Sequence, residues 1–465
     1  MGLVFKSFFA EGIAQLSYLV GDDSEGTAAI IDPRPDVDVY LHEAQRREVS
    51  ITHIFETHIH ADFMSGSREL AERVGGAKIY CSHEGRAEYG FEQEGIRSGD
   101  EFTFGDTLLK VQHTPGHTPE HVAYVLAEKD RADSPWGTVT GDSLFVGSAG
   151  RPDLLGEEET DELTEQLFHT LRDFYLQLDD GTIICPGHGA GSACGADIGD
   201  RPMSTLGYER RFNQFLQIDD FEQFKKFVQE GAPPVPAHYP RLKKVNAAGA
   251  PLIGHVPACP GLPIDAFRQQ AENNSLQVLD VRSMLAFGGG HVPGAINIGG
   301  SRPELSVWAG DMLNPDKPIL LILEEDFQLP RIVTLLWRTG FMNFGGYLVG
   351  GMKMWQNAGL PLKKLPQMSV QELKEDHGTQ RLDVRSPSEW QQGHIPGAMH
   401  HFVGKLRDQM PDLDRNQPVA TYCASGYRAS LAASLLQRAG FEKVHNVPGS
   451  WKAWTSAGYP VDNGG

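Results

Sequence analysis

The sequence predicts an α/β protein built from several domains, and three observations lead to this class. The chain has 465 residues, which is too long for one hydrophobic core and corresponds to roughly three domains. Strand-like and helix-like patterns alternate over residues 1–240. The remainder of the chain contains one series of landmarks twice, in the same order.

The first domain is expected at residues 1–240. Strands are predicted at residues 28–33, 52–55, 78–80, 108–112, 122–126 and 182–184, and helices at residues 36–48, 65–74 and 160–178. Residues 231–236 and 247–263 are rich in proline, glycine and alanine, a composition that resists regular structure. We therefore expect a linker at residues 241–260, although the first of these stretches is equally compatible with a surface loop.

A repeat follows the linker. The recurring residues are Leu279 to Arg282 at positions 382–385, His291 to Ala295 at positions 394–398, Pro318 at Pro418, Gly340 at Gly440 and Trp355 at Trp454. The separation is 103 residues at the start of the repeat and 99 at its end. So many landmarks with so little drift predict two homologous α/β domains, at residues 261–363 and 364–465.

The composition excludes several classes of function. A net charge of −20 has the wrong sign for binding nucleic acid or an anionic membrane. The longest apolar runs are shorter than the roughly 20 residues of a membrane helix, and the N-terminus resembles a strand rather than a signal peptide. A cytoplasmic location is therefore expected. Five cysteines at irregular spacing imply no disulfide framework.

Four short segments carry the side chains of a metal site. Residues 57–62, Thr-His-Ile-His-Ala-Asp, follow a predicted strand and place His58, His60 and Asp62 at every second position. The residues that follow other strands in the same way are His117, Asp142 and His188. Each alone is compatible with a turn residue or a core histidine. Together they predict one open site with nitrogen and oxygen ligands.

The motifs THIHAD, TPGHT, TGDSLF and PGHG resemble the metallo-β-lactamase superfamily over residues 1–240, which implies an αβ/βα sandwich. Hydrolases of that superfamily, such as glyoxalase II, hold two metal ions. For the first metal the resemblance implies the ligands His58, His60 and His117. For the second it implies Asp62, residue 63 and His188, with Asp142 bridging. Phe63 stands where those hydrolases have another histidine, and because a phenyl ring binds no metal, the second site is depleted.

Persulfide dioxygenases, another branch of the superfamily, resemble the chain more closely. They hold one iron(II), and the resemblance implies His58, His117 and Asp142 as its ligands. Such a facial set leaves positions open for sulfur and dioxygen. The residues that then orient ligands and water are His60, Asp62 and His188. Zinc binds such ligands at least as tightly as iron, so Fe(II), at one per chain, and zinc both stay open.

Two further residues are candidates for substrate contacts near this metal. Arg151 belongs to a GRxD segment that resembles one bordering the active site of the dioxygenase branch. It would contact an anionic thiol carrier or, equally, pair with Asp153. Cys194 lies six residues after His188 and could receive a persulfide, although an ordinary loop thiol is the simpler interpretation.

Cys423 opens the loop Cys-Ala-Ser-Gly-Tyr-Arg, between a predicted strand and a helical pattern. Loop N–H groups, the positive helix end and Arg428 would stabilise a thiolate. This loop and the flanking motifs resemble rhodaneses, parallel-sheet α/β domains, over residues 365–465. The resemblance implies that Cys423 carries sulfane sulfur as a persulfide, with Arg428 beside it. The substrate-binding candidates are Asp383, Arg385, Ser425 and Gly426.

The middle domain resembles the same family without its chemistry. Counting from the shared glycine places Leu323 at the position of the nucleophile, and the segment that follows is acidic rather than glycine-containing. A structural or docking role is the expected one.

The combined motifs predict a bifunctional sulfur enzyme. It would oxidise low-molecular-weight thiol persulfides with O2 to sulfite at one non-haem iron, and it would form or use thiosulfate through Cys423. The alternative is a zinc-dependent thioester hydrolase of the glyoxalase II kind fused to a rhodanese. A third interpretation is a persulfide sensor with a structural metal. The thiol carrier stays open among glutathione, coenzyme A and bacillithiol, and a homo-oligomer, dimer or tetramer, is only a general expectation.

Overall fold

The computed structural model describes residues 2–273 and 275–463. The chain divides into two compact units, Met1–His255 and Val256–Gly465, and each is described by itself. None of the helices within the described residues combines the length and the apolar character that crossing a bilayer requires.

Two six-stranded sheets form the first unit. The first sheet contains, in spatial order, β1 (Leu3–Ala10), β2 (Gln15–Asp22), β3 (Thr27–Ile31), β4 (Ser50–Phe55), β5 (Lys78–Ser82) and β6 (Glu94–Ile96). The second contains β14 (Ser204–Thr205), β13 (Ile183–Pro186), β10 (Gly137–Gly141), β9 (Val122–Glu128), β8 (Thr107–His113) and β7 (Glu101–Phe104). A two-stranded ribbon, β11 (Leu144–Phe145) and β12 (Ser148–Ala149), lies beside them.

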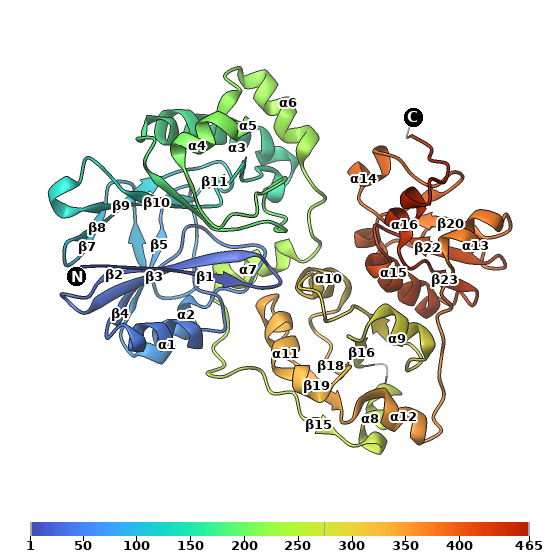
Figure 1. Ribbon diagram of the computed structural model, residues 1–465. Coiled ribbons are helices and arrows are strands. Elements are labelled where there is room, and N and C mark those ends of the chain that lie inside the picture. The colour runs from blue at the N-terminus through green and yellow to red at the C-terminus, as the bar shows by residue number, and fades with distance from the viewer. Residues whose placement is uncertain (1, 274, 464–465) are drawn as a thin grey trace. The chain divides into compact units, whose positions relative to one another are not determined.

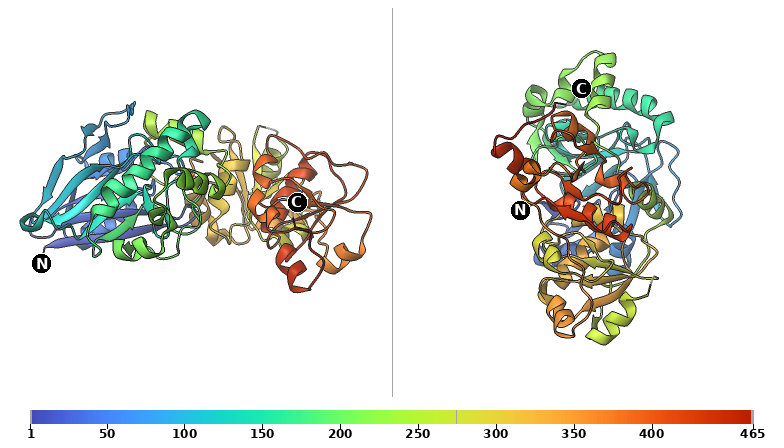
Figure 2. Two further views of the ribbon diagram at one scale, coloured as in Figure 1. Left: turned by 90° about the horizontal axis from the view of Figure 1, so that it is seen from above. Right: turned by 90° about the vertical axis from the view of Figure 1, so that its right-hand side faces the viewer.

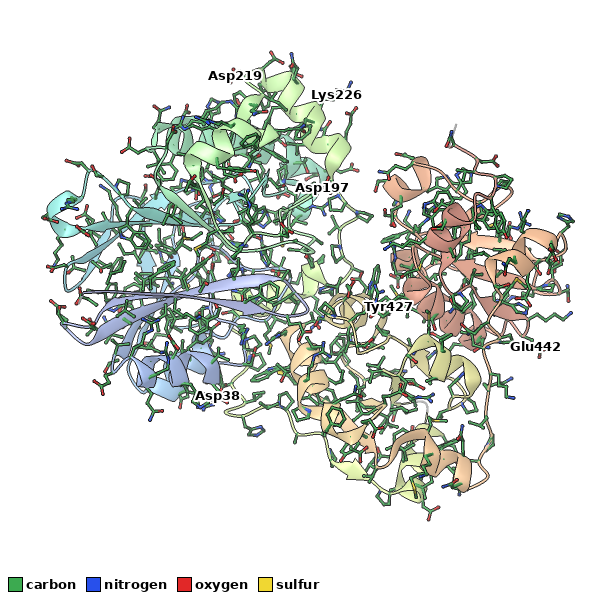
Figure 3. The ribbon with its side chains drawn as sticks, in the orientation of Figure 1. Asp38, Asp197, Asp219, Lys226, Tyr427 and Glu442 are labelled. Atoms are coloured by element: carbon green, nitrogen blue, oxygen red, sulfur yellow. The ribbon has the colours of Figure 1, made fainter. Side chains whose placement is uncertain are left out.

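The sheets are the inner layers of a four-layer sandwich (Figures 1 and 2). Alternation along β2 shows why: Tyr18 and Val20 join the core shared by both sheets, whereas Leu19 packs on the helix side. Side chains fill the space between the sheets (Figure 3). The helices are α1 (Asp38–Arg46), α2 (Ser67–Val74), α3 (Glu157–His169), α4 (Leu206–Phe212), α5 (Gln214–Gln217), α6 (Phe221–Gly231) and α7 (Tyr239–Ala248). The predicted αβ/βα sandwich is confirmed.

Two sequence predictions differ from the structure in this unit. The helix expected at residues 160–178 is interrupted, because α3 continues as a π-helical turn at Thr170–Phe174 and a 3-10 turn at Tyr175–Gln177. Residues 241–248, at the start of the expected linker, belong to α7. The Asn246 side chain on α7 donates hydrogen bonds of 2.7 Å to the carbonyls of His60 and Phe63, which ties this helix to the metal motif.

The second unit contains two parallel sheets, and helices pack against each of them (Figures 1 and 2). The middle domain has β15 (Gly261–Leu262), β19 (Phe344–Leu348), β18 (Ile319–Ile322), β16 (Gln277–Asp280) and β17 (Ile296–Asn297). Its helices are α8 (Ile264–Ala271), α9 (Met284–Gly289), α10 (Leu305–Met312), α11 (Leu329–Arg338) and α12 (Gly351–Asn357).

The last domain repeats this plan. Its strands are β21 (Met399–His400), β20 (Gln380–Asp383), β22 (Val419–Tyr422) and β23 (Val444–Asn446), and its helices are α13 (Val370–Glu375), α14 (Pro387–Gln391), α15 (Tyr427–Arg438) and α16 (Ser450–Ser456). One hydrophobic core extends through both domains. The predicted pair of parallel α/β domains is confirmed.

The contacts of Asn246 lead to a prediction. Asn246→Ala would leave two carbonyls and the Ser65 N–H without their buried partner. We expect the free energy of unfolding of the first unit to fall by about 2–4 kcal/mol. Scanning calorimetry of the full chain measures this loss. Lys244→Ala, on the exposed face of the same helix, should change it by less than about 0.5 kcal/mol, and equal effects of the two substitutions would contradict the assignment.

Candidate functional site

Loops that leave three strands of the first unit converge on one point. His58 follows β4, His117 follows β8 and Asp142 follows β10. Their ligand atoms all lie within 4.8 Å of one another. Asp142 Oδ2 is 4.0 Å from His58 Nε2 and 3.6 Å from His117 Nε2. All three side chains are at most 2% exposed, so this is a buried cluster of donor atoms.

Hydrogen bonds on the far side of each imidazole decide which atom faces the cluster. His117 Nδ1 lies 2.9 Å from the Arg151 carbonyl, which can only accept, so Nδ1 carries the proton and Nε2 presents a lone pair. His58 Nδ1 contacts the Thr57 hydroxyl, which donates to Asp32, so the same tautomer follows. Burial lowers the pKa of both histidines and keeps them neutral.

The Asp142 carboxylate completes a donor set that fits a cation. Its Oδ2 atom has no hydrogen-bond partner among the described residues. Burial alone would raise the pKa of Asp142, but the charge of His188 and its hydrogen bond outweigh burial and hold that pKa below the usual range. Two imidazole lone pairs and a carboxylate oxygen therefore face one another with no proton between them. That arrangement is the one a bound metal ion stabilises.

His188 lies beside this cluster rather than within it. Its Nδ1 is 2.8 Å from Asp142 Oδ1 and its Nε2 is 2.7 Å from Asp62 Oδ2, so both nitrogens donate to carboxylates. Burial opposes a charge on His188, but Asp142 and Asp62 prevail and raise its pKa to about 10. His188 therefore orients the carboxylate of Asp142, and it leaves no lone pair for a second metal ion.

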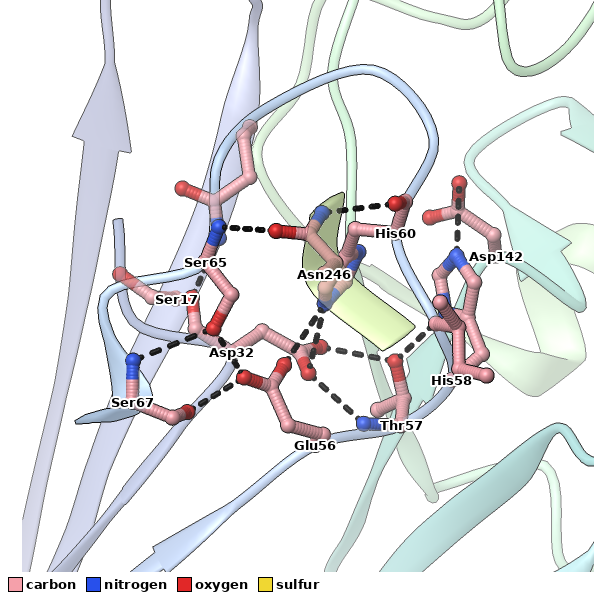
Figure 4. Close-up of polar contacts among 12 residues, drawn as sticks. Ser17, Asp32, Glu56, Thr57, His58, His60, Ser65, Ser67, Asp142 and Asn246 are labelled. Atoms are coloured by element: carbon pink, nitrogen blue, oxygen red, sulfur yellow. Dashed lines mark hydrogen bonds and ion pairs between the residues drawn. The ribbon is translucent and has the colours of Figure 1, made fainter. Parts of the chain in front are cut away.

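His60 faces the opposite way from His58 (Figure 4). Its Nε2 lies 3.1 Å from Asp32 Oδ1 and 3.0 Å from Glu56 Oε2. Burial opposes protonation of His60, but these two carboxylates raise its pKa well above the ordinary value. The structure thus places His60 in a separate ionic cluster with Asp32 and Glu56. Phe63 is fully buried against Ala10 and Ile13.

His121 is a member of the site that the sequence interpretation missed. Its Nε2 accepts a 2.9 Å hydrogen bond from the Asp142 N–H, its Nδ1 bonds Thr114, and its ring stacks on His58 at 5.1 Å. Burial, followed by the nearby His117, lowers its pKa to about 3. The available signal was its position four residues after His117, which places both rings in one loop.

Arg151 and Cys194 have different surroundings from those expected for free substrate contacts. Arg151 is 4% exposed and forms two 2.7 Å hydrogen bonds with Asp153, so its charge is paired. Its backbone carbonyl holds His117. The Cys194 Sγ lies 3.7 Å from the Tyr239 hydroxyl, and burial raises the pKa of this thiol. Cys194 is close to Asp62 and His188, beside the metal cluster.

In the last domain, Cys423 follows β22 and lies in the loop before α15. The Gly426 N–H points at the Cys423 Sγ from 3.1 Å. Gly426 has φ of 106°, a conformation that favours glycine. Arg428 forms two hydrogen bonds with Glu389, of 2.6 and 2.7 Å. Burial opposes the charge on Glu389, but Arg428 lowers its pKa to about 2.

Of the other substrate-binding candidates in the last domain, Asp383 and Arg385 lie at and just after the end of β20, outside the cysteine loop. Asp383 and Arg385 are buried and paired with each other at 2.6 Å, and Arg385 also donates to the Gly393 carbonyl. Ser425 is half-buried next to the cysteine. In the middle domain, Leu323 is buried at the corresponding strand end. The loop therefore brings Cys423, Gly426 and Arg428 together, while Asp383 and Arg385 form an internal ion pair.

Comparisons with known proteins agree with the division into one metal-site domain followed by two parallel α/β domains. The profile of the metallo-beta-lactamase superfamily matches residues 11–188, and that of the rhodanese-like domain matches residues 264–358 and 368–457. A crystal structure of a metallo-beta-lactamase from Staphylococcus aureus is 34% identical, with a TM-score of 0.66, and the match covers 74% of this chain and 98% of that one. The chain belongs to the metallo-beta-lactamase superfamily. It carries two rhodanese-like domains after that fold.

Two curated relatives of the first unit have different names. The hydroxyacylglutathione hydrolase of Trichormus variabilis is 31% identical over 134 residues, which is 29% of this chain and about half, 51%, of that protein. The mitochondrial persulfide dioxygenase ETHE1 of Bos taurus is 27% identical over 235 residues, covering 49% of this chain and 81% of that protein. Both similarities lie within one superfamily of metal-dependent enzymes.

Removing the charge of Asp142 should empty the candidate metal site formed by His58, His117 and Asp142. Asp142→Asn keeps the size of the side chain but removes the negative charge of the carboxylate whose Oδ2 atom has no hydrogen-bond partner among the described residues. We expect the metal content of the purified chain to fall at least about tenfold. Elemental analysis by mass spectrometry measures it. Asp173→Asn, with a side chain 73% exposed, is the matched control. Full metal content in Asp142→Asn would contradict the assignment.

The hydrogen bond of His121 gives a second prediction for the cluster. His121→Phe keeps a ring that can stack on His58 but removes the acceptor of the Asp142 N–H. The affinity for metal should fall about tenfold, because Asp142 loses its backbone anchor. Competition with a chelator measures this affinity. His169→Phe, at an exposed helical position, should leave it unchanged.

Proposed function

We propose that the first unit oxidises a low-molecular-weight thiol persulfide with dioxygen and that Cys423 transfers sulfane sulfur. The observation that carries the first part is the arrangement around Asp142. Asp142 Oδ2 and two neutral imidazoles face one point, while His188 uses both nitrogens to bond carboxylates. This donor set suits one metal ion and offers little to a second.

His58, His117 and Asp142 would hold this ion. Iron(II) held by these residues would supply the activation of dioxygen that oxidation of a persulfide requires. In the overall reaction a persulfide RSSH, one O2 and one water give the thiol RSH, sulfite and two protons. The relative from Bos taurus, named a persulfide dioxygenase, supports this assignment.

The chain's own residues prepare the site for this chemistry. Burial keeps His58 and His117 neutral, so no proton has to leave before they bind a metal ion. His188 fixes Asp142 through Oδ1 and leaves Oδ2 free. His121 anchors the Asp142 backbone. The low exposure of all these side chains limits water around the reacting atoms.

The surroundings of Cys423 support sulfur transfer. Its thiolate would attack the outer sulfur of thiosulfate. The S–S bond of thiosulfate then breaks, sulfite leaves with the electron pair, and a persulfide forms on Cys423. The Gly426 N–H and the positive end of α15 stabilise negative charge on the sulfur. In the reverse direction the persulfide sulfur passes to sulfite, the product of the first unit, and gives thiosulfate.

A second candidate function is a zinc-dependent thioester hydrolase fused to the same rhodanese-like domain. The hydroxyacylglutathione hydrolases among the relatives favour it. The buried Phe63 and the two carboxylate bonds of His188 speak against the second metal ion that this mechanism uses. Two zinc ions per chain, with hydrolysis of a glutathione thioester, would favour the hydrolase.

Separate variants test the two halves of the proposal. The iron-loaded chain should consume O2 with glutathione persulfide and release an equal amount of sulfite, and Asp142→Asn should abolish both. Cys423→Ser should keep oxygen uptake but lose transfer of sulfur from thiosulfate to cyanide. An oxygen electrode, a sulfite assay and a thiocyanate assay measure these reactions. Absence of oxygen uptake with the persulfides of glutathione, coenzyme A and bacillithiol would reject the dioxygenase.

A further inference from the structure

Helix α15 begins in the loop from Cys423 to Arg428, and other parts of the protein cover more than one of its faces. All eight residues from 429 to 436 are buried. A helix at a domain surface normally exposes one face to water. One side of α15 packs on its own sheet, where the Thr421 hydroxyl of β22 donates to the Ala429 carbonyl. Another part of the second unit must therefore cover the other side.

The middle domain supplies that cover. Ser430, Ser434 and Arg438 are spaced four residues apart, which places them on one stripe of α15. The Ser430 hydroxyl donates to Asn297 Oδ1 at 2.5 Å, and the Asn297 N–H donates to Ser434 Oγ at 3.1 Å. Arg438 donates to the Gly294 carbonyl at 2.8 Å. This stripe thus bonds to β17 and the turn before it.

The middle domain also touches the loop itself. The Tyr427 hydroxyl donates to the Gly299 carbonyl at 3.1 Å, and Tyr427 lies at the boundary between the two domains (Figure 3). A Cβ atom on Gly426 would lie 2.9 Å from Met284 Sδ, at the start of α9. Gly426 is the residue whose N–H points at Cys423 Sγ. Met284 therefore packs directly behind a group that holds the sulfur.

We propose that the middle domain is a positioning element for the Cys423 loop. The corresponding loop of the middle domain has Leu323 in place of the nucleophile. What the middle domain offers the last domain is therefore a surface that packs against the Cys423 loop and α15. Met284 and Gly299 confine Gly426 and Tyr427, and Asn297 fixes the stripe of α15. Together they keep the Gly426 N–H and Arg428 in place around Cys423. This inference rests on the sulfur transfer proposed above and assigns Met284 and Tyr427 as positioning residues.

Two variants of the full chain test it from opposite sides. Met284→Ala removes the packing behind Gly426, and Tyr427→Phe with Ser430→Ala removes two interdomain hydrogen bonds without altering the middle domain. Each should lower kcat for thiosulfate:cyanide sulfur transfer about tenfold with KM changed less than about twofold, because the loop that binds the sulfur is displaced. Met284→Leu, of similar volume, should restore kcat. Lys353→Ala, exposed on α12, is the control.

A second readout is independent of turnover. The rate at which iodoacetamide alkylates Cys423 should change at least about threefold in both variants, and amide exchange at residues 424–428 should become faster. Wild-type kcat, alkylation and exchange in both variants would overturn the positioning role. If the wild-type chain transfers no sulfur while alkylation and exchange still respond to the variants, the proposed sulfurtransferase activity fails and the positioning role stands.

Discussion

The candidate metal centre depends on how the buried carboxylate of Asp142 is held. One oxygen accepts from His188, the backbone N–H donates to His121, and the other oxygen is left facing His58 and His117. A buried carboxylate oxygen without a partner is costly, and a cation between it and two imidazole lone pairs offsets that cost. The strand-end loops of the first unit are therefore arranged around the negative charge of Asp142.

Neighbours, rather than residue type, decide the charge of each histidine in this region. His58, His117 and His121 are buried beside acceptors or other imidazoles, and burial holds their pKa values low. His60 and His188 are equally buried, but each lies between two carboxylates that raise its pKa. The neutral rings of His58 and His117 thus face the candidate metal position, whereas the charged rings of His60 and His188 bond to carboxylates. This division leaves one set of ligands for one metal ion.

The second unit uses one fold in two ways. The last domain keeps a cysteine in the loop between β22 and α15, whereas the middle domain has Leu323 at the corresponding place. The middle domain instead contributes Asn297 and Met284 to the surroundings of α15 and its loop. A continuous hydrophobic core joins the two domains. Loss of the nucleophile therefore leaves a packing surface that the other copy uses.

The sequence by itself determined the features that local pattern encodes. Histidines and aspartates placed directly after strands predicted one shared site, because strand ends share a sheet edge, and the repeat predicted two homologous α/β domains. The choice of His58, His117 and Asp142 within that site came from the family resemblance. Only the tertiary structure decided which way His60 turns, that Arg151 is paired, that His121 supports Asp142, and that α7 joins the first unit. Apart from the pairing of Arg151 with the nearby Asp153, those outcomes depend on partners distant in sequence, as between Asn246 and His60, and no local periodicity records them.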